Sequence, residues 1–151
     1  MTVGVPVATR AESLRRVEHE VGALIRRVRR VIGDRARAVH PDLQPATYLL
    51  LTHLDEPGPL RASALVDVTG VDKGAISRQV QQLVDLELLT RTQDPDDGRA
   101  TLLAVTDDAR ARLRRVQRDR RRRFDQRLGE WSDADLADFA SRLADYNAAL
   151  D

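Results

Sequence analysis

The apolar residues near the N-terminus recur at steps of three and four, the spacing of an amphipathic helix. The stripe contains Leu14, Val17, Val21, Leu24, Val28 and Val31. It predicts a long helix over residues 12–39, which ends before His40 because a residue that precedes proline is disfavoured in the α region. A second helix is predicted from Gln44 or Pro45 to Leu54, ahead of a Pro-Gly-Pro breaker at residues 57–59.

Two short helical segments follow, at residues 61–68 and 72–86, and three residues separate them. Helices joined by so short a turn are a candidate helix-turn-helix over residues 61–86. The apolar positions of the second segment share one face: Ile76, Val80, Leu83 and Val84. The polar positions predicted to face outward are Lys73, Ser77, Arg78 and Gln81. The second helix therefore presents small and hydrogen-bonding side chains to a partner.

A β-hairpin is predicted over residues 88–105, with strands of about six residues on either side of the turn at residues 94–98. Thr106 then has the character of a helix N-cap, and Ser132 with Asp135 resembles a capping box at the start of a last helix. We therefore predict a mainly α fold with a small β-hairpin wing. Its winged helix-turn-helix covers residues 45–105, and terminal helices at residues 12–39 and 107–150 flank it.

Both terminal helices carry apolar stripes that one small winged domain cannot cover. The last helix repeats Leu136, Phe139, Leu143, Tyr146 and Leu150 at steps of three and four. In the first helix the corresponding candidates are Leu14, Val17 and Val21. Pairing across a two-fold axis would bury both stripes, so the pattern predicts a homodimer.

Composition narrows the classes of function. The chain has 151 residues, the size of one domain, and no cysteine, which excludes disulfides and thiolate chemistry. No apolar run is long enough to span a bilayer and no export signal begins the sequence, so we expect a cytoplasmic protein with no membrane partner. Residues 107–127 carry ten arginines against four aspartates, whereas Lys73 is the only lysine in the chain.

The sequence contains no pattern of residues that is typical of a catalytic or metal-binding site. The sequence offers no nucleophile beside a general base and no glycine-rich phosphate loop. His19, His40 and His53 share no metal-ligand spacing. We therefore expect neither an enzyme nor a cofactor or metal site.

With these elements in order, three segments resemble the MarR-type transcriptional regulators. They are LRASALV at residues 60–66, VDKGAISRQVQQL at 71–83, and the wing RTQDPDDGR at 91–99, which leads into LAVT at 103–106. The resemblance covers residues 12 to 150, and the wing motif is its most specific part. Two positions depart from the family pattern. Arg61 stands where the family usually has a capping Thr or Ser, and Glu87 stands where it usually has Gly. A glutamate at position 87 is strained if the backbone there is left-handed.

The resemblance implies that the second motif helix enters the major groove of double-stranded DNA and that the wing enters the minor groove. Arg78 can form bidentate hydrogen bonds with guanine, and Gln79 and Gln82 can pair with adenine. Lys73 can contact a phosphate. Arg99 suits a narrow minor groove, with Asp97 placed to pair with it or with Arg91. The implied DNA-binding set is Arg61, Ser63, Asp72, Lys73, Gly74, Ala75, Ser77, Arg78, Gln79, Gln82, Arg91, Asp97 and Arg99.

The resemblance also implies a repressor that binds a pseudo-palindromic operator and is relieved by a small aromatic or lipophilic effector. His53 and Leu50 are the candidate pocket residues, with a hydrogen-bonded structural histidine as the alternative for His53. Residues 61–99 carry five cations against seven acids. This net negative charge leaves open a winged-helix module that binds proteins and not DNA.

Overall fold

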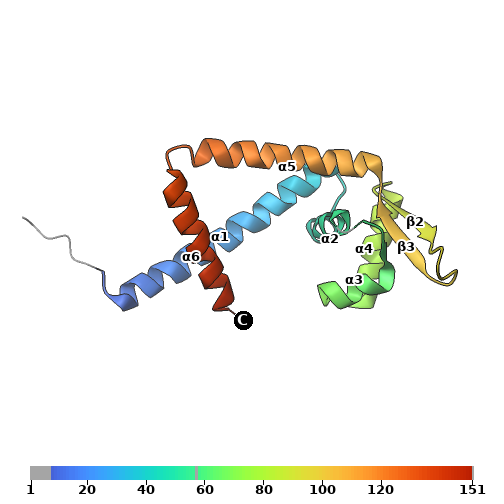
Figure 1. Cartoon of the computed structure of the whole chain (residues 1–151), viewed down its shortest axis with the longest axis horizontal. Coiled ribbons are helices and arrows are strands. Elements are labelled where there is room, and N and C mark those ends of the chain that lie inside the picture. The colour runs from blue at the N-terminus through green and yellow to red at the C-terminus, as the bar shows by residue number, and fades with distance from the viewer. Residues whose placement is uncertain (1–7, 57, 151) are drawn as a thin grey trace, which may run out of the picture. The chain divides into compact units, whose positions relative to one another are not determined.

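The computed structural model describes residues 8–56 and 58–150. The elements in chain order are α1 (Arg10–Val39), α2 (Pro45–Asp55), β1 (Leu60–Arg61), α3 (Ala62–Thr69), α4 (Lys73–Asp85), β2 (Leu89–Gln93), β3 (Thr101–Val105), α5 (Asp107–Arg127) and α6 (Asp133–Ala148) (Figure 1). The chain divides into two compact units, Met1–Leu113 and Arg114–Asp151. The predicted fold class is confirmed: the protein is mainly helical with one small antiparallel sheet.

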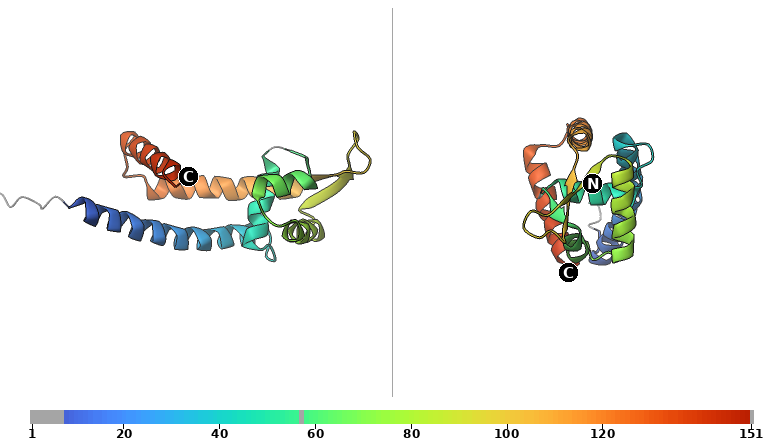
Figure 2. Two further views of the ribbon diagram at one scale, coloured as in Figure 1. Left: turned by 90° about the horizontal axis from the view of Figure 1, so that it is seen from below. Right: turned by 90° about the vertical axis from the view of Figure 1, so that its right-hand side faces the viewer.

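The N-terminal unit (Met1–Leu113) has a leucine-rich core. The largest fully buried side chains are Leu51, Leu54, Leu65, Leu83, Leu88, Leu89, Leu103 and Leu113. Leu88 lies between α4 and β2, and the others come from α2, α3, α4, both long strands and α5, so the core holds the helix-turn-helix against the sheet. The first part of α1 extends away from this core, as the left view of Figure 2 shows.

The sheet has three strands in the order β1-β3-β2, all antiparallel. Leu89 pairs with Val105 and Gln93 with Thr101, so β2 and β3 form the predicted hairpin with five residues in each strand. The two-residue strand β1 was not predicted, and it adds Leu60 opposite Leu103. This pairing anchors the segment before α3 to the base of the wing.

Local capping explains where several helices begin. Thr106 accepts a hydrogen bond from the backbone N–H of Ala109 at 3.2 Å, which confirms it as the N-cap of α5. Ser132 and Asp135 form the predicted capping box of α6. Glu87 follows α4 with φ of 57°, the left-handed conformation that glycine adopts more readily.

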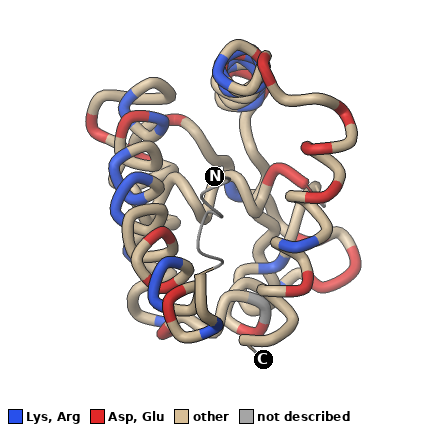
Figure 3. The backbone as a smooth tube through the Cα atoms, turned by 90° about the vertical axis from the view of Figure 1, so that its left-hand side faces the viewer, with Lys and Arg blue, Asp and Glu red and all other residues tan. Residues whose placement is uncertain are grey.

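The C-terminal unit (Arg114–Asp151) holds most of α5 and all of α6. Trp131 and Phe139 contact each other edge to face, with ring centroids 5.5 Å apart. No residue of α6 is buried in the single chain. Charge differs between the two helices: α5 carries ten arginines against four aspartates, whereas α6 carries four aspartates against the single Arg142. Figure 3 colours the basic and acidic positions along the whole backbone.

Candidate functional site

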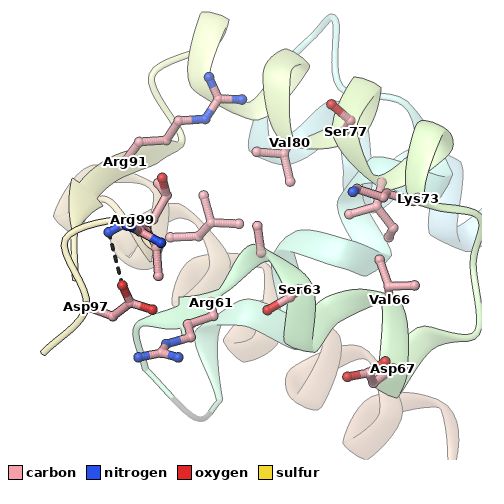
Figure 4. A pocket seen from close by; sticks show the side chains of 15 residues that line it. Arg61, Ser63, Val66, Asp67, Lys73, Ser77, Val80, Arg91, Asp97 and Arg99 are labelled. Atoms are coloured by element: carbon pink, nitrogen blue, oxygen red, sulfur yellow. Dashed lines mark hydrogen bonds between the residues drawn. The ribbon is translucent and has the colours of Figure 1, made fainter.

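An open groove of about 900 Å³ lies between α3, α4 and the wing (Figure 4). Apolar side chains such as Val66, Ile76, Val80 and Leu103 line it together with charged and polar ones. The groove brings together seven residues of the predicted DNA-binding set: Arg61, Ser63, Lys73, Ser77, Arg91, Asp97 and Arg99. Residues separated by up to 38 positions in the sequence therefore share one surface.

The N-terminus of α4 is built around Asp72. Its carboxylate accepts a hydrogen bond from the backbone N–H of Ala75 at 3.1 Å and so caps the helix. Gly74 makes room for this cap, because a Cβ atom there would lie 3.0 Å from the carboxylate. Lys73 is the first residue of the helix and is exposed. Asp72 and Gly74 thus have structural roles, and the ammonium group of Lys73 is presented to solvent.

The two faces of α4 divide as predicted. Ile76, Val80 and Leu83 are buried, whereas Ser77 and Arg78 are exposed. This arrangement leaves the guanidinium of Arg78 available to a partner.

Gln82 differs from its predicted role. Its amide group donates to the backbone carbonyl of Asp42 at 3.1 Å and accepts from the hydroxyl of Thr47 at 2.8 Å. The amide of Gln82 is therefore held by Thr47 of α2 and by Asp42 in the loop before α2, and it is not placed to read adenine. Gln79 is half-buried beside it along α4.

The wing also differs in detail from the prediction. Asp97 accepts a hydrogen bond from the backbone N–H of Arg99 at 3.1 Å, and not from the guanidinium of Arg99 or Arg91. Arg91 instead donates to the amide oxygen of Gln81 at 2.9 Å, which joins β2 to α4. The predicted pairing of Asp97 with an arginine side chain is therefore wrong, because the turn uses its carboxylate to hold the backbone.

Asp94 was missed as a site residue. Its side chain is only 6% exposed and forms an ion pair with Arg61, with 2.6 Å between Nη2 and Oδ2. The backbone N–H of Asp96, followed by the Arg61 guanidinium, lowers the pKa of the Asp94 carboxyl below its usual value. An Asp at the start of a turn often accepts hydrogen bonds from the backbone of that turn, so this role could have been predicted from the sequence. The ion pair with Arg61 could not, because only the folded chain brings the two residues together.

The remaining predicted residues lie elsewhere. Leu50 is buried in the core and His53 is half-buried on α2, and neither lines the groove. Six of the predicted dimerisation residues are exposed hydrophobics: Leu14, Val17, Leu136, Phe139, Leu143 and Leu150. The other two, Val21 and Tyr146, are half-buried.

Within residues 8–56 and 58–150, no group of three or more His, Cys, Asp or Glu side chains is arranged to hold a metal ion. None of the described helices combines the length and the apolar character needed to cross a membrane.

Comparison with known proteins identifies the family. The pattern that defines the MarR family matches residues 42–100. The HTH-type transcriptional regulator YxaD of Bacillus subtilis is 35% identical over 134 residues, which are 89% of this chain and 92% of YxaD.

Solved structures share the fold. The crystal structure of RV1404 from Mycobacterium tuberculosis superposes with a TM-score of 0.80 at 24% identity, over 95% of this chain and 98% of that one. A MarR family transcriptional regulator from Listeria monocytogenes, solved with a 26mer DNA, gives a TM-score of 0.65 at 16% identity over 87% of each chain. The sequence match, the winged architecture and these structures agree, and the chain therefore belongs to the MarR family of winged helix-turn-helix transcriptional regulators.

Proposed function

We propose that this regulator binds double-stranded DNA sequence-specifically, with α4 in the major groove and the tip of the wing in the adjacent minor groove. The observation that carries the proposal is the groove itself, which gathers Lys73, Ser77 and Arg99 on the exposed side of α4 and the wing. The Listeria regulator with the same fold is in complex with DNA, which supports this class of ligand.

The chemistry of each position suits a part of the duplex. Arg78 is exposed and, within the described residues, its guanidinium has no ion-pair partner, so it is free to bind O6 and N7 of guanine. Lys73 and the backbone N–H groups at the start of α4 suit a phosphate. Arg99 suits the negative potential of a narrow minor groove. Gln82 is left out of this interface because its amide is bonded within the domain.

The regulator acts in this proposal as a homodimer on a pseudo-palindromic operator. Phe139 is 52% exposed and Leu143 is 39% exposed on α6, and α1 separately exposes Leu14 and Val17. Apolar stripes of this kind are rarely left in water, and a second copy would bury them. Two winged domains then bind half-sites about one helical turn apart.

Regulation in this proposal is repression in the cytoplasm, relieved by a small aromatic or lipophilic effector. A dimer that covers its operator blocks access to the promoter. An effector that binds better to one spacing of the two recognition helices shifts the protein toward that spacing. His53 and Leu50 remain the predicted pocket residues, and a screen for compounds that change DNA affinity tests this step.

Fluorescence anisotropy with the DNA that flanks the gene tests the proposal. The protein is titrated with that duplex and with a scrambled one, at two salt concentrations. We expect tighter binding to the native duplex, and a loss of about 5- to 150-fold in affinity for Arg78→Ala, the range of one bidentate base contact. Arg15→Ala, which removes an exposed arginine from α1, is the matched control and leaves affinity unchanged.

A protein-binding role without DNA is the second candidate. It is favoured by the seven acids against five cations in residues 61–99. Equal and weak binding to every duplex, including those recovered from a random-sequence selection, would favour this second role.

A further inference from the structure

Arg61 has an unusual position at the start of the helix-turn-helix. It belongs to β1 and is the N-cap of α3, yet its side chain makes no capping hydrogen bond. The side chain crosses instead to the wing, where Nε and Nη2 each lie 2.6 Å from Oδ2 of Asp94. A charged contact therefore joins the residue before α3 to the residue after β2.

Asp94 is fixed from several sides. Its Oδ1 atom accepts a hydrogen bond from the backbone N–H of Asp96 at 2.8 Å, and its own N–H donates to the carbonyl of Ala100 at 3.0 Å. The side chain is nearly buried, whereas that of Arg61 is 46% exposed. Charge-assisted bonds to a buried carboxylate are among the stronger contacts in a protein, so this one holds its two segments firmly.

The same network continues to the tip of the wing. The backbone N–H of Ala100 donates to the carbonyl of Asp97 at 2.9 Å, and the Asp97 carboxylate accepts from the N–H of Arg99. The turn from Asp94 to Arg99 is thus one hydrogen-bonded segment. Its side-chain link to the start of α3 is Arg61.

We propose that Arg61 is a positioning residue, which anchors the wing turn to the helix-turn-helix through Asp94 and so sets where Arg99 meets DNA. The inference rests on the proposed function, because it takes Arg99 as a DNA contact. It replaces the direct DNA contact predicted for Arg61 from sequence.

The first experiment needs no DNA. Amide hydrogen exchange is measured on the full-length protein for wild type, Arg61→Ala and Asp94→Asn. We expect exchange at Asp96, Arg99 and Ala100 to quicken by about tenfold or more in both variants, the factor that follows from losing a hydrogen bond to a charged group. Arg61→Lys keeps the charge and recovers much of the protection, and Arg78→Ala leaves wing exchange unchanged.

The second experiment measures affinity for a duplex recovered by selection from a random pool. Arg61→Ala and Asp94→Asn each weaken binding, and the double variant is no weaker than the worse single one, because both remove the same contact. A direct phosphate contact would behave differently. Arg61→Ala would then make the negative slope of log affinity against log salt shallower by about 0.9. The affinity losses of Arg61→Ala and Asp94→Asn would add in the double variant.

The outcomes separate the two proposals. Unchanged wing exchange in Arg61→Ala, in a variant whose unfolding midpoint shows that it folds, overturns the anchoring role whatever the DNA result. Additive losses with a reduced salt slope overturn it in favour of direct contact. Faster wing exchange in a protein that binds no duplex leaves the anchor in place and refutes the proposed DNA binding.

Discussion

The hydroxyl of Thr47 donates a hydrogen bond to the amide oxygen of Gln82 at 2.8 Å and ties α2 to α4. Thr47 is only 2% exposed, and Gln82 uses its amide nitrogen on the carbonyl of Asp42. This small polar network sits between the helix that precedes the helix-turn-helix and the helix proposed to read DNA. It fixes the position of α4 by direction-dependent bonds, in addition to leucine packing.

Loss of this bond should weaken the fold. Thr47→Val keeps the shape of the side chain and removes its donor, so the amide oxygen of Gln82 loses its partner. We expect the free energy of unfolding to fall by about 1–3 kcal/mol, measured by urea denaturation. Thr52→Val is the matched control on the same helix, since the Thr52 hydroxyl bonds only a carbonyl of its own helix. A similar loss in both variants would contradict the role of the Thr47 bond.

Glu87→Gly should stabilise the protein. The residue has φ of 57°, and the backbone bonds of its N–H to Val84 and of its carbonyl to Thr106 do not depend on the side chain. We expect a gain of about 0.5–1 kcal/mol in the free energy of unfolding, from relief of left-handed strain. Glu56→Gly is the control, because Glu56 is right-handed with φ of −72° and gains nothing. A lower free energy of unfolding for Glu87→Gly would contradict the prediction that the left-handed backbone at Glu87 is strained.

The start of α6 should be sensitive to acid. The Ser132 hydroxyl, followed by its backbone N–H, lowers the pKa of the Asp135 carboxyl. A carboxyl whose pKa is lower in the folded state stabilises that state fully above its unfolded pKa of about 3.9, and this contribution is lost as pH falls through the folded pKa. An NMR titration should give a midpoint for Asp135 below the usual value. Ser132→Ala should raise that midpoint. If wild type and Ser132→Ala gave the same midpoint, the hydrogen bonds from Ser132 would not be the cause of the lowered pKa of Asp135.

The apolar stripe of α6 should control assembly. Leu143→Glu places a charge among the exposed apolar residues of the helix, which the proposed dimer would bury at a high free-energy cost. We expect light scattering after size exclusion to show a monomer where wild type is a dimer. Ser141→Glu adds the same charge at another exposed position of α6 and should leave the dimer intact. A dimeric Leu143→Glu protein would move the interface away from this stripe.

Sequence periodicity predicted most of the architecture because it depends on local spacing. The buried face of α4 and the capping box at Ser132 follow from residues a few positions apart. They need no knowledge of the tertiary fold. The helix periods and turn residues likewise gave the order of the elements.

Contacts between distant segments were beyond that reasoning. Strand β1 has two residues and exists because Leu103 lies opposite Leu60, so no periodicity could reveal it. Gln82 reads as an outward polar residue until α2 is packed beside it. The ion pair of Arg61 with Asp94 spans 33 positions, and only the folded sheet brings the two together.

Lys73 is both the first residue of α4 and the only lysine of the chain. An amine-selective reagent therefore has one side-chain target, and that target lies on the groove. Acylation would remove a positive charge at the surface proposed to meet DNA, and a bound duplex would shield the amine from the reagent. The extent of acylation, read by mass spectrometry, thus provides an intrinsic footprint of occupancy that needs no engineered label.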